Sequence, residues 1–201
     1  MAIANKSIDP VLIKCAKEEF LLNGYNNTSM NVICKRAGIT TGALFKRYSS
    51  KEDLFYGVVG NSINKLKSLF INELTSFSLL TFEEQSKIYS SSNYYLKALD
   101  IIYDNYDDFK IIIDRSSLVQ YSAFLDYFVE LETKFTMNFI RKFDSQTIIH
   151  QDTVHILKTG YFNGIFEVVR HNFKKTDAAM YIQQLHNFYS KGWENILNTM
   201  S

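Results

Sequence analysis

The side chains whose spacing most clearly indicates chemistry are five cations in a stretch, from Phe20 to Lys51, that contains no Asp or Glu. They are Lys35, Arg36, Lys46, Arg47 and Lys51. A run of charges of one sign can make several contacts to an anionic polymer, and the phosphate backbone of DNA is such a polymer. Most short charged runs are only a solvated surface. The elements that carry these cations therefore decide between the two interpretations.

The segment begins with the pattern of a short helix that ends in a glycine turn. Its apolar residues have the i, i+3, i+4, i+7 spacing of one buried helix face: Met30, Ile33, Cys34 and Ala37. The hydroxyl of Thr28 or Ser29 can cap the first free amides of this helix. Gly38 ends it, because glycine accepts the left-handed backbone conformation that a tight turn requires.

A second short helix follows the turn and presents an outer face of its own. Thr40 can cap this helix, and Leu44 and Tyr48 lie one turn apart on its buried side. The residues left on the outer side are Thr41, Gly42, Phe45 and Lys46. Two short helices joined by a glycine turn form a helix-turn-helix, which places its second helix in the major groove of DNA. The pattern therefore favours DNA binding over a merely solvated surface.

The helix-turn-helix assigns a role to each polar residue around it. The candidate DNA-binding residues are Thr28, Ser29, Arg36, Thr40, Thr41, Gly42, Phe45, Lys46, Arg47, Tyr48 and Lys51. We expect Lys46, Arg47 and Lys51 to contact phosphates, while Thr41, Gly42 and Phe45 approach base edges.

Residues 24–55, GYNNTSMNVICKRAGITTGALFKRYSSKEDLF, resemble the DNA-binding half of the TetR family of bacterial repressors. The resemblance rests on Gly24-Tyr25, Thr28-Ser29, Ile33, Ala37-Gly38, Gly42, Leu44, Ser50-Lys51-Glu52 and Leu54-Phe55. It covers about the first quarter of the chain and implies a dimeric, mostly helical transcription regulator with a second, ligand-binding half. Phe45 stands where the family often has a Tyr that contacts a phosphate, and it can pack instead on a sugar or a thymine methyl.

Composition and spacing predict an all-α fold. The 201 residues are 46% hydrophobic, with a single proline and eight glycines, and their apolar spacing is helical almost throughout. We expect about nine helices: an N-terminal three-helix bundle that holds the helix-turn-helix, then a C-terminal helical domain for ligand binding and dimerisation. Residues 1–50 are the expected DNA-binding domain, with its motif at about 29–48, and residues 51–201 the effector-binding and dimerisation domain.

The charge of the chain is uneven. Residues 1–56 carry eight Lys and Arg against five Asp and Glu, a balance of +3, whereas residues 57–201 carry fourteen against sixteen, a balance of −2. This asymmetry places an anionic partner, expected to be double-stranded operator DNA, at the N-terminal domain.

No group of side chains argues for catalysis, a metal site or a cofactor. The sequence has no phosphate-cradling glycine loop and no zinc-type Cys/His spacing. Its histidines are scattered: His150, His155, His171 and His186. Cys15 and Cys34 both lie on apolar helix faces, as reduced core thiols do. We therefore expect a protein that is not an enzyme and needs no cofactor.

The chain also lacks the marks of a membrane or exported protein. No segment reaches the roughly 18 apolar residues of a membrane span. The first ten residues, MAIANKSIDP, have no long apolar core of the kind that a signal peptide needs. We expect a cytoplasmic protein with no membrane partner.

The last two helices, expected at about 153–172 and 177–199, are apolar on more than one side, which indicates burial on both sides. Two such helices from each of two copies can form a four-helix bundle. The expected homodimer interface contains Tyr161, Ile165, Val168, Leu185, Phe188, Tyr189, Trp193 and Ile196. An intramolecular core is the alternative interpretation of the same pattern.

Aromatic residues are dense after residue 56, with ten Tyr, thirteen Phe and the single Trp. Aromatics at helical spacing are more often core than pocket, but the resemblance implies a cavity for a small apolar or aromatic effector. The expected lining is Ile63, Leu66, Phe70, Tyr94, Tyr121, Phe124, Phe128 and Tyr161. Asp126, Glu130 or Glu167 could face a cationic effector.

The expected function is therefore sequence-specific transcriptional regulation, by a repressor that a small effector releases from a palindromic operator. Two alternatives remain. One is a corepressor-type regulator that needs its ligand to bind DNA, and the other is a small helical enzyme with a decayed helix-turn-helix.

Overall fold

The computed structural model describes residues 8–81, 84–85, 94–143 and 149–198, and every regular element among them is a helix. These residues form two compact units. The first unit contains the chain up to residue 64 together with residues 105–121, and the second contains residues 65–104 and 122–201. The first unit is thus larger than the DNA-binding domain expected from the sequence, residues 1–50.

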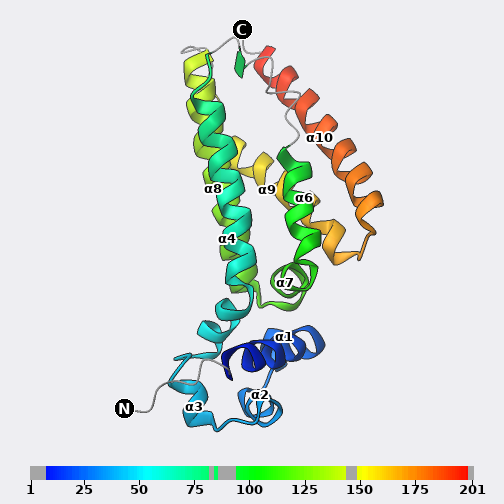
Figure 1. Cartoon of the computed structure of the whole chain (residues 1–201). Coiled ribbons are helices and arrows are strands. Elements are labelled where there is room, and N and C mark those ends of the chain that lie inside the picture. Colours follow the sequence, from blue (N-terminus) through cyan, green and yellow to red (C-terminus); the bar gives the residue numbers. More distant parts are fainter. Residues whose placement is uncertain (1–7, 82–83, 86–93, 144–148, 199–201) are drawn as a thin grey trace. The chain divides into compact units, whose positions relative to one another are not determined.

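The first unit is built from the N-terminal helices and a later segment, residues 105–121, that packs back against them and is called the returning segment. The helices are α1 (Ile8–Asn27), α2 (Met30–Ala37) and α3 (Thr41–Phe45), followed by the beginning of α4 (Lys51–Ser78). The returning segment contains α7 (Tyr106–Lys110) and the π-helix η1 (Ile111–Arg115). Figure 1 shows α2 and α3 as consecutive short helices separated by a turn. This is the helix-turn-helix that the apolar spacing predicts.

The turns of the helix-turn-helix form for the reasons read from the sequence. Gly38 adopts the left-handed conformation, with φ 66°, and its amide bonds to the carbonyls that end α2. The Thr40 hydroxyl accepts a hydrogen bond of 3.1 Å from the amide of Ala43 and caps α3. The Ser50 hydroxyl likewise accepts from the amide of Asp53 at 3.0 Å, at the start of α4.

The first helix kinks at Gly24 and continues to Asn27. Gly24 has φ 72° and ψ 167°, a conformation that only glycine adopts readily. The Gly24 carbonyl accepts a 2.7 Å hydrogen bond from the Thr28 hydroxyl and a 3.1 Å hydrogen bond from the Thr28 amide.

A buried carboxylate ties the returning segment to the rest of the first unit. Asp108 of α7 lies 2.5 Å from the ammonium of Lys17 in α1 and accepts a 2.5 Å hydrogen bond from Ser62 of α4. Asp108 is buried, where the Lys17 ammonium offsets its charge and the Ser62 hydroxyl donates a hydrogen bond to it. Residues 105–121 are thereby fixed to both α1 and α4.

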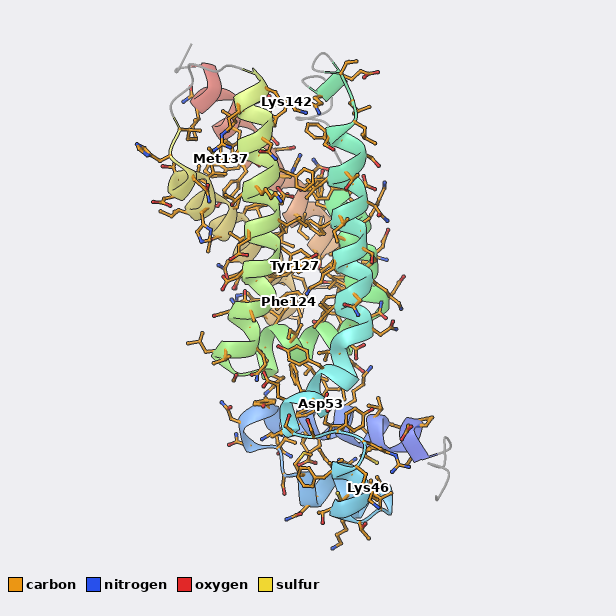
Figure 2. The ribbon with its side chains drawn as sticks, turned by 90° about the vertical axis from the view of Figure 1, so that its left-hand side faces the viewer. Lys46, Asp53, Phe124, Tyr127, Met137 and Lys142 are labelled. Carbon is orange, nitrogen blue, oxygen red and sulfur yellow. The ribbon has the colours of Figure 1, made fainter. Side chains whose placement is uncertain are left out.

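The second unit contains the rest of α4 with α6 (Tyr94–Asp104), α8 (Leu118–Phe143) from residue 122 onward, α9 (Gln151–Arg170) and α10 (Lys175–Asn198). The helices α9 and α10 are consecutive and lie side by side (Figure 1). Phe70 of α4 stacks edge-on against Phe128 of α8, with ring centres 5.0 Å apart, and Phe128 also contacts Phe162 of α9. Tyr127 of α8, labelled in Figure 2, lies under Lys67, whose Nζ is 3.9 Å from the ring centre.

None of the helices in the described ranges combines the length and the hydropathy that crossing a lipid bilayer requires.

Candidate DNA-binding surface and ligand cavity

The outer face of α3 is exposed in the first unit. Thr41, Gly42, Phe45 and Lys46 all lie on the surface, and the Phe45 side chain is 50% exposed. Figure 2 shows Lys46 at the end of α3. Leu44, on the opposite side of the same helix, is fully buried. The helix thus presents two polar residues, one glycine and one aromatic ring to solvent, without using them in its own core.

Three of the five cations in the acid-free stretch have partners inside the first unit. Arg47 bonds through Nε to Asp9, at 2.6 Å, and through a guanidinium nitrogen to the Ala43 carbonyl at 3.0 Å. Arg36 forms ion pairs with Glu18 and with the buried Glu19. These two guanidinium groups brace α2 and α3 against α1.

Lys51 is the third of these cations. Its Nζ donates a 3.2 Å hydrogen bond to the carbonyl of Asn26 and lies 4.8 Å from the centre of the Tyr25 ring. Burial lowers the pKa of the Lys51 ammonium. Lys51 therefore stabilises the carbonyl end of α1, where a cation is favourable.

Lys35 and Lys46 differ from these three residues. Both are exposed, and neither forms an ion pair with any residue that the structure describes. Both can therefore contact a phosphate without giving up an ion pair within the described part of the first unit. Lys35 was not among the candidate DNA-binding residues, although it belongs to the same acid-free run.

Three other candidate DNA-binding residues, Thr28, Ser29 and Tyr48, lie at helix ends or pack against neighbouring residues of the first unit. Thr28 is buried, and its hydroxyl donates to the Gly24 carbonyl. Ser29 occupies the N-cap of α2 without a side-chain hydrogen bond to the helix. Tyr48 is half-buried against Gly57 of α4, where an added Cβ would lie 2.5 Å from the Tyr48 ring. Burial raises the pKa of the Tyr48 hydroxyl. Tyr48 thus sets how α3 meets α4.

The second unit contains a cavity of about 290 Å³ that opens to solvent and is lined by residues of α4, α6, α8, α9 and α10. Its walls are mainly aromatic, and the rings that line it are Phe77, Tyr94, Phe135, Phe139, Tyr161, Tyr189 and Trp193. Burial raises the pKa of the Tyr189 hydroxyl. A cavity of this kind fits an apolar or aromatic small molecule.

Two polar groups interrupt the aromatic wall. Glu132 of α8 and Lys158 of α9 form an ion pair of 2.6 Å, and the Tyr94 hydroxyl donates to the same carboxylate. On the other side, the ring nitrogens of His186 meet the hydroxyls of Tyr161, at 3.2 Å, and Ser190, at 3.3 Å. Both groups lie in the cavity lining and can orient a ligand.

The cavity and the lining expected from the sequence overlap in two residues, Tyr94 and Tyr161. Five of the others are buried in solid core: Ile63, Leu66, Phe70, Phe124 and Phe128. Tyr121 belongs to the first unit. These six positions are therefore corrected: they do not line the cavity, and five of them pack in the core. Asp126, Glu130 and Glu167 do not line this cavity either.

The lining that sequence reasoning missed follows a pattern of its own. Glu132, Phe135, Thr136 and Phe139 of α8 have i, i+3, i+4, i+7 spacing, and so do His186, Tyr189, Ser190 and Trp193 of α10. A helix face that mixes aromatic and polar residues at this spacing was the available signal.

The residues expected at the dimer interface differ in how far the single chain buries them. Tyr161, Ile165, Val168 and Trp193 are buried within the single chain, so they are corrected from the interface to the intramolecular core. Leu185, Tyr189 and Ile196 are partly buried. Phe188 alone of the set is fully on the surface, with 73% of its side chain exposed.

A metal centre has no support in the part of the chain that the structure describes, which holds no group of three or more His, Cys, Asp or Glu side chains placed to bind a metal ion.

Comparison with known proteins places these features in context. Residues 12–58 match the family model for bacterial regulatory proteins of the tetR family. No curated protein matches the chain by sequence.

Solved structures share the fold. NalD, the secondary repressor of the MexAB-OprM multidrug efflux pump in Pseudomonas aeruginosa, is 20% identical, with a TM-score of 0.57 over 91% of this chain and 95% of that one. The fatty acid degradation regulator FadR from Bacillus halodurans is 18% identical, with a TM-score of 0.57 over 91% and 98%. A transcriptional regulator from Aquifex aeolicus is 18% identical, with a TM-score of 0.54 over 94% of this chain and 99% of that one.

Proposed function

We propose that this chain is a repressor of the TetR family, whose model matches residues 12–58, and that it binds a palindromic operator as a homodimer. A small effector that enters the cavity of the second unit releases it. In this proposal the chain is a DNA-binding regulator and not an enzyme. NalD is described as a repressor and FadR as a regulator, which supports the repressor role. We also propose that the protein acts in the cytoplasm.

The exposed face of α3 is the observation that carries this proposal. The helix is capped, anchored by a buried leucine and braced by Arg47, yet its outer residues have no role in the core of the first unit. A rigid helix with an unused outer face is what major-groove binding requires. Thr41, Gly42 and Phe45 approach base edges, while Lys46 contacts a phosphate.

The homodimer uses the last two helices. Ile156 of α9 and Met180 and Phe188 of α10 are large apolar side chains that each expose more than half of their surface. Large exposed apolar residues mark protein interaction surfaces when they gather on one face. A second copy of the chain buries them and brings two α3 helices to the two half-sites of an operator.

The effector acts through α4. This helix begins at Lys51 in the first unit, and Glu73, Leu74, Ser76 and Phe77 of the same helix line the cavity. A ligand that displaces the lining shifts α4 and changes the distance between the two half-site readers. A coupling of about 1–3 kcal/mol would lower operator affinity about 5- to 150-fold, and operator DNA would weaken effector binding by the same factor.

A gel shift on the DNA upstream of the protein's own gene, with and without cell extract, tests the proposal. Binding that extract or an isolated effector weakens supports an inducible repressor. Binding that requires the extract would instead identify a corepressor-type regulator. Failure to bind any fragment of that DNA in either condition would contradict the operator proposed there.

A further inference from the structure

We propose that the cavity of the second unit selects an uncharged aromatic compound with one hydrogen-bonding group, and that the Glu132–Lys158 ion pair sets this selectivity. The inference rests on the proposed effector site, but it concerns ligand binding alone. It can therefore be tested without DNA.

The charged groups of the described cavity lining are already matched. Glu132 is 3% exposed and Lys158 is 8% exposed, and their charged atoms lie 2.6 Å apart. Tyr94 donates to the second oxygen of the Glu132 carboxylate, so both oxygens have a partner. At the rim, Glu73 pairs with Lys97 at 2.5 Å.

A charged ligand would disturb this balance. A carboxylate or an ammonium group that entered the cavity would leave bulk water and find its natural counter-charge occupied. It would have to break the buried ion pair, which strands the other partner in apolar surroundings. An uncharged ligand keeps the pair intact and loses only weakly bound water from its apolar body.

The rest of the lining defines the form of this uncharged ligand. Seven aromatic rings surround the cavity, and such rings favour stacked or edge-on contacts with an aromatic guest. The hydroxyls of Tyr161 and Ser190, held by His186, offer a polar end to an alcohol, phenol or amide. The recognised class is therefore a neutral aromatic molecule with one such group.

Three ligands with the same body test the selectivity: 4-butylbenzyl alcohol, 4-butylbenzoate and 4-butylbenzylammonium. Trp193 is the only tryptophan of the chain and lines the cavity, so its fluorescence, excited at wavelengths that the ligands do not absorb, reports occupancy directly. We expect the alcohol to bind at least about tenfold more tightly than either ion, because both ions carry an unmatched charge into the cavity.

Two substitutions reverse the selectivity if the ion pair controls it. Lys158→Met leaves the Glu132 carboxylate without its cation, so the ammonium ligand should become the tightest of the three. Glu132→Gln leaves the lysine without its anion, so the carboxylate should become the tightest. The double variant removes both charges and should again prefer the alcohol, which keeps the test available if a single variant does not fold. Lys134→Met, an exposed change on α8, is the matched control and should leave the order unchanged.

Several results would overturn the inference. These are equal affinities for the three ligands, tighter binding of either ion to the unaltered protein, no binding of any of them, or single variants that fold but keep the original order. Selective binding of the alcohol with no effect on operator binding would leave the inference standing and contradict the proposed effector role.

Discussion

Replacing Gly42 with alanine should separate DNA binding from folding. Gly42 is helical and exposed, and a Cβ added there would meet only the Thr40 hydroxyl oxygen, at 4.0 Å. The fold has room for this methyl group. If α3 lies in the major groove, however, the methyl group would stand between the backbone of α3 and the base edges.

The two effects have opposite signs. Glycine in a helix is less stable than alanine by about 0.5–1 kcal/mol, so the variant should unfold at a temperature about 1–4 °C higher. On the operator, a methyl group forced into a close contact costs about 1–3 kcal/mol for each subunit. This corresponds to about a 5- to 150-fold loss of affinity at each half-site.

Thermal unfolding and operator titration at fixed salt measure the two effects. Gly60→Ala is the matched control, because Gly60 is also helical and a Cβ added there would meet nothing within 4 Å. The control should raise the unfolding temperature similarly and leave operator affinity unchanged. If Gly42→Ala kept full operator affinity, or if both variants lost it equally, the face assigned to DNA would be wrong.

Three further tests concern the cations, the dimer and the buried carboxylate. Lys46→Ala should leave the unfolding temperature unchanged and lower the salt slope of operator binding by about one per subunit. Arg47→Ala should instead lower the unfolding temperature. Identical unfolding temperatures for the two variants would contradict the assignment of Lys46 to DNA and Arg47 to the fold. Phe188→Asp should fold but sediment as a monomer at low micromolar concentration, while the equally exposed Leu79→Asp stays dimeric; a dimeric Phe188→Asp would exclude this surface. Asp108→Asn should reduce the free energy of unfolding by about 1–3 kcal/mol, measured with denaturant, because its lysine partner loses a compensating charge.

The helix-turn-helix could be predicted from the sequence because its determinants are local. Gly38 and Thr40 act on residues within one turn of themselves, so the sequence neighbourhood contains the whole interaction. The buried position of Leu44 follows from the spacing of its own helix. The family-model match to residues 12–58 and the all-helical fold agree with this interpretation.

The roles of individual cations could not be predicted in the same way. Arg47 and Lys46 are adjacent, yet one bonds to Asp9, thirty-eight positions away, and the other is exposed. Glu19 is a carboxylate and is nevertheless buried, beside Arg36. The partner of a long charged side chain depends on tertiary packing, which charge patterns along the chain do not contain.

The cavity was hard to locate for a related reason. Periodicity shows which face of a helix is buried, but it does not show whether the buried rings meet or leave a space. Phe70 and Phe128 satisfy the pattern of a lining and instead fill the core, with ring centres 5.0 Å apart. Glu132 and Lys158 are charged, so a search for apolar helix faces passes over them. They nevertheless line the cavity, as an ion pair.

The return of residues 105–121 to the first unit limits how this regulator can be recombined. The chain crosses between the units at residues 64–65, 104–105 and 121–122, so the N-terminal helices do not form a module with a single attachment point. A chimaera that joined residues 1–50 to the effector domain of another regulator would leave Lys17 without Asp108 and Gly24 without the Arg115 carbonyl beside it. Exchange of operator specificity in this protein is therefore better attempted by replacing the outer residues of α3 than by exchanging whole domains.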